Sequence, residues 1–294
     1  MVKAQNNMTL TEIVNELDSI ELTNSIGCIE NVSFMTGLIL SGLPWLHHPI
    51  KAGTVISRCR KDAPNLEKTS FGCKPKELVK DFQRASIPHE TVFYGAVGDR
   101  DVEDGDFIAM LETSKIHRNN ITFGREEIYV SRWIVKQDID MALITHPKVF
   151  VDSNLGSTVD EMQKNYIRLL PSYPAERDFI VEFDKLVEFV ARQFAKRVNN
   201  SNNFEYMISA YFAHNTLETD AGIIYPSVQV KGRLGYNVAL RPDIVESHLD
   251  FNGAEKHILY KAANYMQVPA NSFSDKYLAM SLEIDNIDIL PKVE

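Results

Sequence analysis

Hydrophobic and polar positions along the chain form short blocks that predict strands interrupted by helices. Runs rich in β-branched and aromatic residues, each bounded by Gly, Pro, Asn or charged residues, predict strands at 54–59, 91–97, 128–135 and 236–240. Apolar residues at helical spacing predict helices at about 75–82 and 106–114, over 176–198, and near 204–213. Because these helices are inserted between strands and do not alternate with them one for one, we expect an α+β fold.

The strongest helix signal lies over 176–198, where the apolar residues fall on one stripe that is typical of a core-facing helix. At the start of the chain, Thr9 and Glu12 match a capping box and are followed by apolar residues at helical spacing. We therefore interpret 1–49 as an N-terminal helical extension and place the main domain at 50–294. The last apolar run, 282–290, is typical of an edge strand.

Composition narrows the class of protein without naming a function. The chain has 294 residues, 31 basic and 40 acidic, with a net charge of −9, which excludes disordered and fibrous classes and disfavours nucleic-acid or anionic-membrane binding. Three cysteines without a C-x-x-C pair suit a reducing compartment, so we expect a cytoplasmic protein. The start of the chain does not read as a signal peptide, and the most apolar stretch, 34–46, is too short and broken for a membrane span.

Standard motifs for metal, phosphate and serine-hydrolase chemistry are absent from the sequence. The spacings of His47, His48, Cys59, Cys73 and His89 match no zinc pattern, so we expect no metal and no cofactor of that kind. There is no P-loop, no G-x-G-x-x-G and no G-x-S-x-G. Ser227, which follows a proline, therefore needs another explanation.

Five short segments supply that explanation when they are taken in order. The run 57–60 (SRCR) places arginines in an apolar strand, 82–96 (FQRASIPHETVFYGA) adds an arginine before a proline turn and a tyrosine in a strand, and 109–112 (AMLE) ends on a glutamate. GIIYPSVQ (222–229) and GYNVAL (235–240) follow. Over about 50–249, this order resembles the RES domain family, and the Arg, Glu and Ser for which that family is named look like Arg58, Glu112 and Ser227.

The resemblance implies a fold, an activity and a partner. It implies two packed, mostly antiparallel β-sheets of the diphtheria-toxin ADP-ribosyltransferase type, with an NAD+ cleft between them and with inserted and flanking helices. Family members destroy NAD+ by cleaving its nicotinamide-ribose bond, and several are toxins paired with an antitoxin. We therefore expect 50–294 to be a RES-like catalytic domain with C-terminal additions, and NAD+ and a cognate antitoxin or regulatory protein to be its partners.

The chemistry of NAD+ cleavage gives each candidate residue a role. Guanidinium groups suit a buried pyrophosphate, which makes Arg58, Arg60 and Arg84 candidates, although Arg60 fits a surface ion pair equally well. A carboxylate stabilises the positive charge that develops on the ribose, and Glu112 is the candidate for that role. Tyr94 would offer an aromatic face and a hydroxyl to the substrate, with a core strand tyrosine as the alternative.

Ser227 and Asn237 complete the predicted site as hydrogen-bonding residues around the nicotinamide ribose or amide, with turn residues as the alternative. The acceptor is left open between water, inorganic phosphate and a protein side chain, and a catalytically inactive RES-like binding module is the rival from another class. Departures from the family pattern motivate that rival: Ala85 and Ser86 stand where Trp and Asn are common, His89 where Gly is common, and 99–106 is an acidic insertion.

Overall fold

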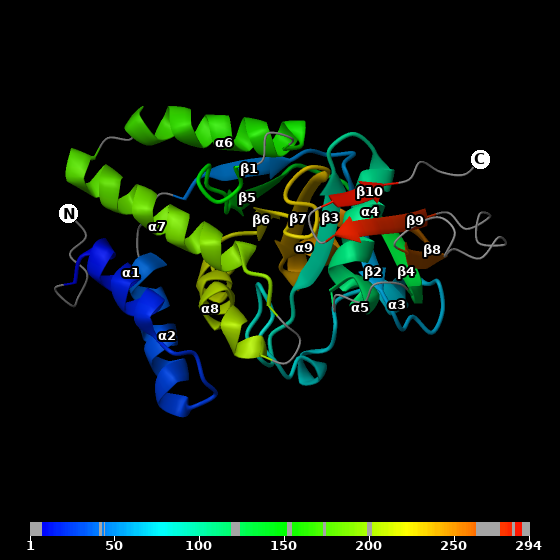
Figure 1. The fold of residues 1–294 in the computed structure, drawn as a ribbon, viewed down its shortest axis with the longest axis horizontal. Helices are drawn as coiled ribbons and strands as arrows, with labels where there is room; N and C mark the ends of the chain where they lie inside the picture. Colours follow the sequence, from blue (N-terminus) through cyan, green and yellow to red (C-terminus); the bar gives the residue numbers. More distant parts are fainter. Residues whose placement is uncertain are drawn as a thin grey trace.

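Ten strands follow one hydrogen-bonded order, β1-β5-β6-β7-β3-β2-β4-β8-β9-β10, in the computed structural model (Figure 1). The structure describes residues 8–40, 43, 45–118, 124–151, 155–172, 175–198, 202–262, 277–283 and 286–289. The strands are β1 His47–Ile50, β2 Val55–Arg60, β3 Phe93–Gly98, β4 Gly124–Val135, β5 Ile139–Leu143, β6 Gly222–Pro226, β7 Gly235–Leu240, β8 Leu249–Ala262, β9 Tyr277–Glu283 and β10 Asn286–Ile289. Neighbouring strands are antiparallel except for β5–β6 and β8–β9, so the sheet is mixed and the fold is α+β.

The pairing between β2 and β3, in the middle of this strand order, is weak. β2 and β3 share a single bridge, Ser57 with Ala96, whereas β2–β4 and β3–β7 each pair over six residues. Two separate sheets are therefore not observed among the described strands. Instead, two five-stranded halves meet at one bridge.

The helices are α1 Leu10–Ser19, α2 Ile26–Leu40, α3 Lys68–Phe71, α4 Val102–Thr113, α5 Lys115–Arg118, α6 Ser157–Leu169, α7 Arg177–Ala195, α8 Met207–Thr216 and α9 Pro242–His248. Short 3₁₀ turns occur at Lys76–Leu78, Leu170–Ser172 and Asn203–Tyr206. The helix predicted over 75–82 is wrong, because only the turn at Lys76–Leu78 forms there. Phe82 of that segment is buried by packing against Phe204 and Tyr211, so tertiary contacts account for its apolar character.

The N-terminal extension is helical, and it shares its core with the rest of the chain. The predicted capping box forms, since Thr9 Oγ1 accepts from Glu12 N at 3.2 Å and the Glu12 carboxylate accepts from Thr9 N at 2.7 Å. α1 and α2 pack with α7, α8 and strands β6 and β7 in one hydrophobic cluster. β1 extends across the predicted boundary at residue 49. α2 was not predicted from the sequence.

Side chains on β2 alternate between two environments, and this alternation positions the candidate arginines. Ser57 and Cys59 face α4, because the Ser57 hydroxyl donates to Asp106 of that helix and Cys59 packs against the α4 cluster. Arg58 and Arg60 therefore lie on the opposite face of β2, where the Arg58 guanidinium lies 4.4 Å from the centre of the Phe93 ring.

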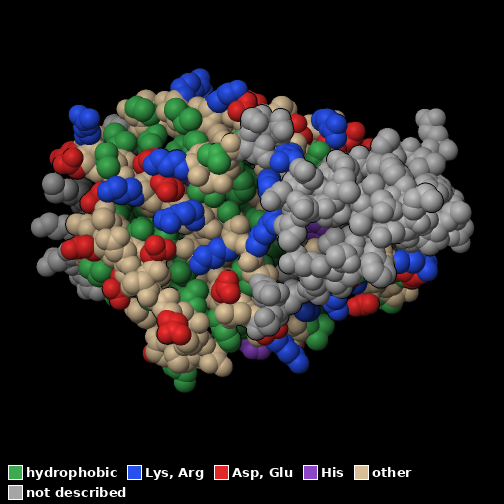
Figure 2. Space-filling view, in the orientation of Figure 1, with side chains coloured by type: hydrophobic (Ala, Val, Ile, Leu, Met, Phe, Trp, Pro, Cys, Tyr) green, Lys and Arg blue, Asp and Glu red, His purple; other side chains and the backbone are tan. Residues whose placement is uncertain are grey.

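Basic side chains gather over α7 on the face seen in Figure 2, although the net charge of the chain is negative. The exposed basic residues of this helix are Arg177, Lys185 and Arg192. Just beyond the C-terminal end of α7, Arg197 is also exposed. Acidic residues of the same helix, Asp178, Glu182, Asp184 and Glu188, lie among them, so charges of both signs alternate along α7.

Candidate functional site

Helix α4 carries Glu112 and is held rigidly against the sheet. Asp101 caps its N-terminus by accepting from Asp104 N at 2.9 Å, and a Cβ added at Gly98 would overlap the backbone of that capping turn. Asp106 is fully buried and accepts from Ser57 Oγ at 2.6 Å and from Arg132 Nη2 at 2.7 Å. These bonds join α4 to β2 and β4, so the position of Glu112 at the end of the helix is well determined.

Three of the predicted residues meet directly at the end of α4. Ser227 Oγ donates to Glu112 Oε1 at 2.8 Å, and Asn237 Nδ2 donates to the same oxygen at 2.9 Å. Both donors are buried, with Ser227 at 0% and Asn237 at 5% exposure. Ser227 and Asn237, which the sequence suggested as direct ligands of the substrate, instead orient the carboxylate through Oε1.

The second carboxylate oxygen of Glu112 is differently placed. Within the part of the chain that the structure describes, Oε2 makes no hydrogen bond or ion pair. It is also not fully enclosed by the protein. Glu112 is thus held by one oxygen and presents the other to solvent. This arrangement suits a carboxylate that accepts hydrogen bonds from a ligand or faces a developing positive charge.

Tyr94 contacts Arg58 through its backbone carbonyl, and its hydroxyl bonds the turn that follows Arg84. The Arg58 Nη1 donates to the Tyr94 carbonyl at 3.0 Å. The Tyr94 hydroxyl accepts from Ala85 N at 3.0 Å and lies 3.0 Å from Ser86 Oγ, which fixes the turn after Arg84. Burial raises the pKa of Tyr94 to about 12, so its hydroxyl stays protonated at neutral pH.

Arg84 caps the C-terminal end of α7. Its guanidinium donates to the Phe194 carbonyl, to the Lys196 carbonyl at 3.0 Å and to the Tyr206 hydroxyl at 3.5 Å. Cations are favoured at helix C-termini, where the last carbonyls lack partners. Arg84 therefore has a structural role on the face of the sheet that carries Glu112, and only its remaining N–H groups are open to a phosphate.

Arg58 and Arg60 form a pair of like charges without a neutralising carboxylate among the described residues. Arg58 is 7% exposed, and burial followed by the proximity of Arg60 lowers the pKa of Arg58 to about 10. Its Nε is enclosed and has no hydrogen-bond partner. Arg60 Nη2 donates to the Gly72 carbonyl at 2.7 Å. Because they face away from α4, the two arginines do not share a face of the strand with Glu112.

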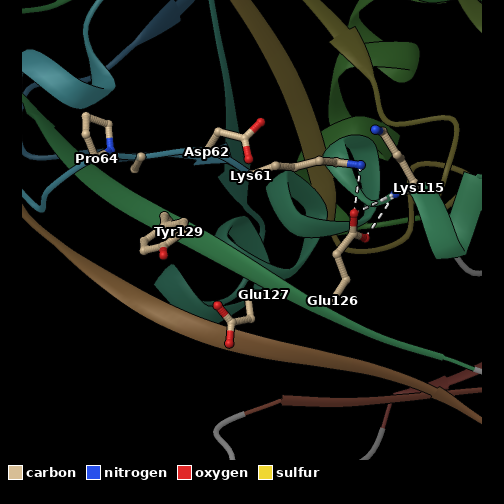
Figure 3. A pocket seen from close by; sticks show the side chains of 8 residues that line it. Lys61, Asp62, Pro64, Lys115, Glu126, Glu127 and Tyr129 are labelled. Atoms are coloured by element: carbon tan, nitrogen blue, oxygen red, sulfur yellow. Dashed lines mark hydrogen bonds and ion pairs between the residues drawn. The ribbon is translucent and has the colours of Figure 1, made fainter.

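A separate cleft of about 620 Å³ opens where β2 turns away from β4 (Figure 3). It is lined by Lys61, Asp62, Ala63, Pro64, Lys115, Glu126, Glu127 and Tyr129, none of which was predicted as a primary site residue. Glu126, a carboxylate 14 positions after Glu112 in the sequence, accepts there from Lys61 Nζ at 2.8 Å and from Ser114 Oγ at 2.7 Å. Its carboxylate is fully engaged, which leaves Glu112 the better candidate.

The departures from the family pattern have structural explanations. His89 adopts φ 65°, in the left-handed region that favours glycine, so the turn after Pro88 requires that conformation. In the acidic insertion, the Asp99 carboxylate caps α6 by accepting from Thr158 N at 2.6 Å and Ser157 N at 2.8 Å. Burial would raise the pKa of Asp99, but these hydrogen bonds outweigh it and hold the pKa below its ordinary value. The insertion therefore builds structure.

Comparison with known proteins adds no relative. We found no matching protein-family model and no significant match among curated proteins. Across the described residues, no cluster of three or more His, Cys, Asp or Glu side chains is arranged to hold a metal ion. None of the helices in the described ranges is both long and apolar enough to cross a bilayer.

Sequence reasoning did not single out Tyr225, which lies beside the candidate site. Its ring lies on β6 directly across from Asn237 of β7, and it packs 5.3 Å from the Phe194 ring, centre to centre. The signal was available, because Tyr225 and Ser227 lie two positions apart and strand side chains two apart share a face. The sequence assigns the aromatic role to Tyr94 because the resemblance to the RES domain family rests in part on that tyrosine.

Proposed function

We propose that this protein is an NAD+-consuming enzyme that cleaves the bond between nicotinamide and ribose. The observation that carries the proposal is the convergence of Glu112, Ser227 and Asn237. Glu112 is 115 positions from Ser227 and 125 positions from Asn237 in the sequence, yet both side chains donate to its carboxylate. All three residues are also among those that the resemblance to the RES domain family predicts for the site.

The geometry of Glu112 fits the chemistry of the proposed step. As the nicotinamide-ribose bond breaks, positive charge develops on the ribose, and a carboxylate held in advance stabilises it without reorganising. Ser227 and Asn237 hold Oε1, and Oε2 remains for the ribose. Neither Ser227 nor Asn237 has a role as a nucleophile in this proposal, because both donate to the carboxylate.

Positive charge near the site supports binding of the substrate's two phosphates. Arg84, which lies on the face of the sheet that carries Glu112, forms no ion pair with a carboxylate within the described residues, whereas Arg58 and Arg60 lie on the opposite face of β2. A buried, unneutralised charge destabilises a protein, and a phosphate ligand would offset that cost.

The fold is compatible with the two-sheet arrangement of ADP-ribosyltransferase-like proteins. We propose that the two five-stranded halves, linked by the Ser57–Ala96 bridge, correspond to its two sheets, and that the substrate enters where they meet. Water or inorganic phosphate is the acceptor that we propose, and a toxin role with a regulatory partner follows only from the family resemblance.

The test is release of nicotinamide from NAD+ by the purified protein, with and without phosphate, compared with Glu112→Gln. The variant keeps the shape of the side chain but loses its charge, so turnover should fall about 10²- to 10³-fold while NAD+ affinity changes little. Glu127→Gln is the matched control, because Glu127 is an exposed β4 carboxylate that pairs with Lys256. Absence of nicotinamide release by the wild type would reject the proposal in favour of a binding module.

A further inference from the structure

We propose that Tyr225 binds the ribose of the substrate beside Glu112, as the hydroxyl donor that completes the site. This inference rests on the proposed function and deepens it, since it assigns a ligand contact to a residue that the sequence did not single out. The chemical class of the ligand is a ribosyl group that carries a vicinal diol. Glu112 Oε2 would accept from one sugar hydroxyl, and the Tyr225 hydroxyl would donate to the other.

The sheet register places Tyr225 next to the residues that hold Glu112. Tyr225 on β6 pairs with Asn237 on β7, and directly opposed residues of antiparallel strands have Cβ atoms about 5 Å apart on the same face. Ser227 follows two positions later on the side of Tyr225. The ring of Tyr225 thus lies on the surface that also bears the two donors to Glu112.

The hydroxyl of Tyr225 is without a partner, although the side chain is buried. Within the described residues it makes no hydrogen bond, and it is not one of the enclosed polar atoms that lack a partner. The side chain keeps 4% of its surface exposed, and its ring packs against Phe194. Unsatisfied hydroxyls at otherwise buried tyrosines call for an explanation, and a ligand hydroxyl would supply the missing bond.

Electrostatics keep this hydroxyl in its donor form. Burial holds the pKa of Tyr225 well above its ordinary value, Arg84 lowers it, and the nearby Tyr94 and Glu112 raise it further. A protonated phenol beside a carboxylate pairs one donor with one acceptor. Adjacent sugar hydroxyls, each of which can donate and accept, match such a pair.

By contrast, the hydroxyl of Tyr94, the tyrosine that the sequence favoured, already makes hydrogen bonds within the protein. Its hydroxyl accepts from the buried Ala85 N and contacts Ser86 Oγ. Removing that hydroxyl would leave a buried N–H without its partner, whereas removing the hydroxyl of Tyr225 would break no bond in the free protein. The two tyrosines therefore differ in what their phenylalanine variants should do to stability.

The experiment measures nicotinamide release and thermal unfolding for Tyr225→Phe, with Tyr236→Phe as the matched control. Tyr236 is a buried tyrosine of the neighbouring strand, and its position next to Asn237 in β7 puts it on the opposite face. We expect Tyr225→Phe to lower kcat/KM about five- to tenfold, the effect of losing one hydrogen bond, at unchanged melting temperature. Tyr236→Phe should leave kcat/KM unchanged, and Tyr94→Phe should lower the melting temperature.

Each outcome decides a different question. If the wild type cleaves NAD+ and Tyr225→Phe cleaves it equally well, the inference is overturned while the proposed function stands. If the wild type releases no nicotinamide, the proposed function fails, and calorimetry with ADP-ribose then decides the inference by itself. Binding that is weaker in Tyr225→Phe than in the wild type supports a ribosyl site, and equal or absent binding overturns it.

Discussion

Replacing Asn237 with aspartate puts a second carboxylate against Glu112 and probes how closely the site is packed. In the wild type, the Asn237 amide donates to Glu112 Oε1 at 2.9 Å and is 5% exposed. Aspartate has nearly the same shape but offers an oxygen where the N–H stood. Two ionised carboxylates cannot remain at this distance, so the pair should share one proton.

The size of the effect follows from the distance. Two unit charges 2.9 Å apart repel by about 6 kcal/mol at an effective dielectric constant of about 20, which corresponds to several pH units. The pKa of the pair is then raised in the folded protein above its unfolded value of about 4. Stability that depends on the shared proton is fully present below pH 4 and is lost as the pH rises toward the folded pKa.

Chemical denaturation of Asn237→Asp and of the wild type between pH 5 and pH 7 measures this effect. The free energy of unfolding of the variant, relative to the wild type, should fall by about 1.4 kcal/mol for each pH unit. Asn237→Ala is the control, since it removes the donor without adding a charge, and its difference from the wild type should stay nearly constant. Parallel pH profiles for Asn237→Asp and the wild type would refute the close approach of Asn237 to Glu112.

Three further predictions concern charges with structural roles. Asp99→Ala should lower the free energy of unfolding by about 1 kcal/mol at pH 7 through loss of the α6 cap. This difference should begin to shrink only below about pH 4 and disappear as the pH falls through the lowered pKa of folded Asp99, because a depressed pKa contributes stability that is fully present above the unfolded value. Urea titrations at a series of pH values from about 7 down to about 2.5 would show it. Arg84→Lys should cost about 1 kcal/mol or more in the same assay, because an ammonium cannot bond the Phe194 and Lys196 carbonyls as a fork does; equal midpoints would contradict the capping role. Arg58→Met should raise the free energy of unfolding by about 1 kcal/mol in the same assay, and a loss of stability would show that the buried charge is compensated.

The elements that local pattern predicted well are strands rich in β-branched and aromatic residues and a helix with one apolar stripe. β2, β3, β4 and β7 lie within a few residues of their predicted ranges, and α7, with its single apolar stripe, spans Arg177–Ala195 against a prediction of 176–198. α2 escaped prediction because it is apolar on nearly all sides, packed against α1 and α8, and so lacks the periodicity of a half-exposed helix.

Within the candidate site, the sequence by itself determined which residue types are present and which strands and helices carry them. Glu112, Ser227 and Asn237 could be chosen because their segments resemble the RES domain family, and the chemistry of NAD+ cleavage then gave each of them a role. What these side chains contact could not, because hydrogen bonds between residues more than 100 positions apart depend on how the strands are ordered in the sheet.

Only the tertiary structure decided which tyrosine and which arginines lie on the same side of the sheet as Glu112. The hydroxyl of Tyr94 is taken by a turn, Arg84 caps α7, and Arg58 lies on the face of β2 away from Glu112. Tyr225 reaches the site because β6 pairs with β7 in a register that sets it across from Asn237. Residue type limits what a side chain can do, and sheet order, register and strand face determine what lies within its reach.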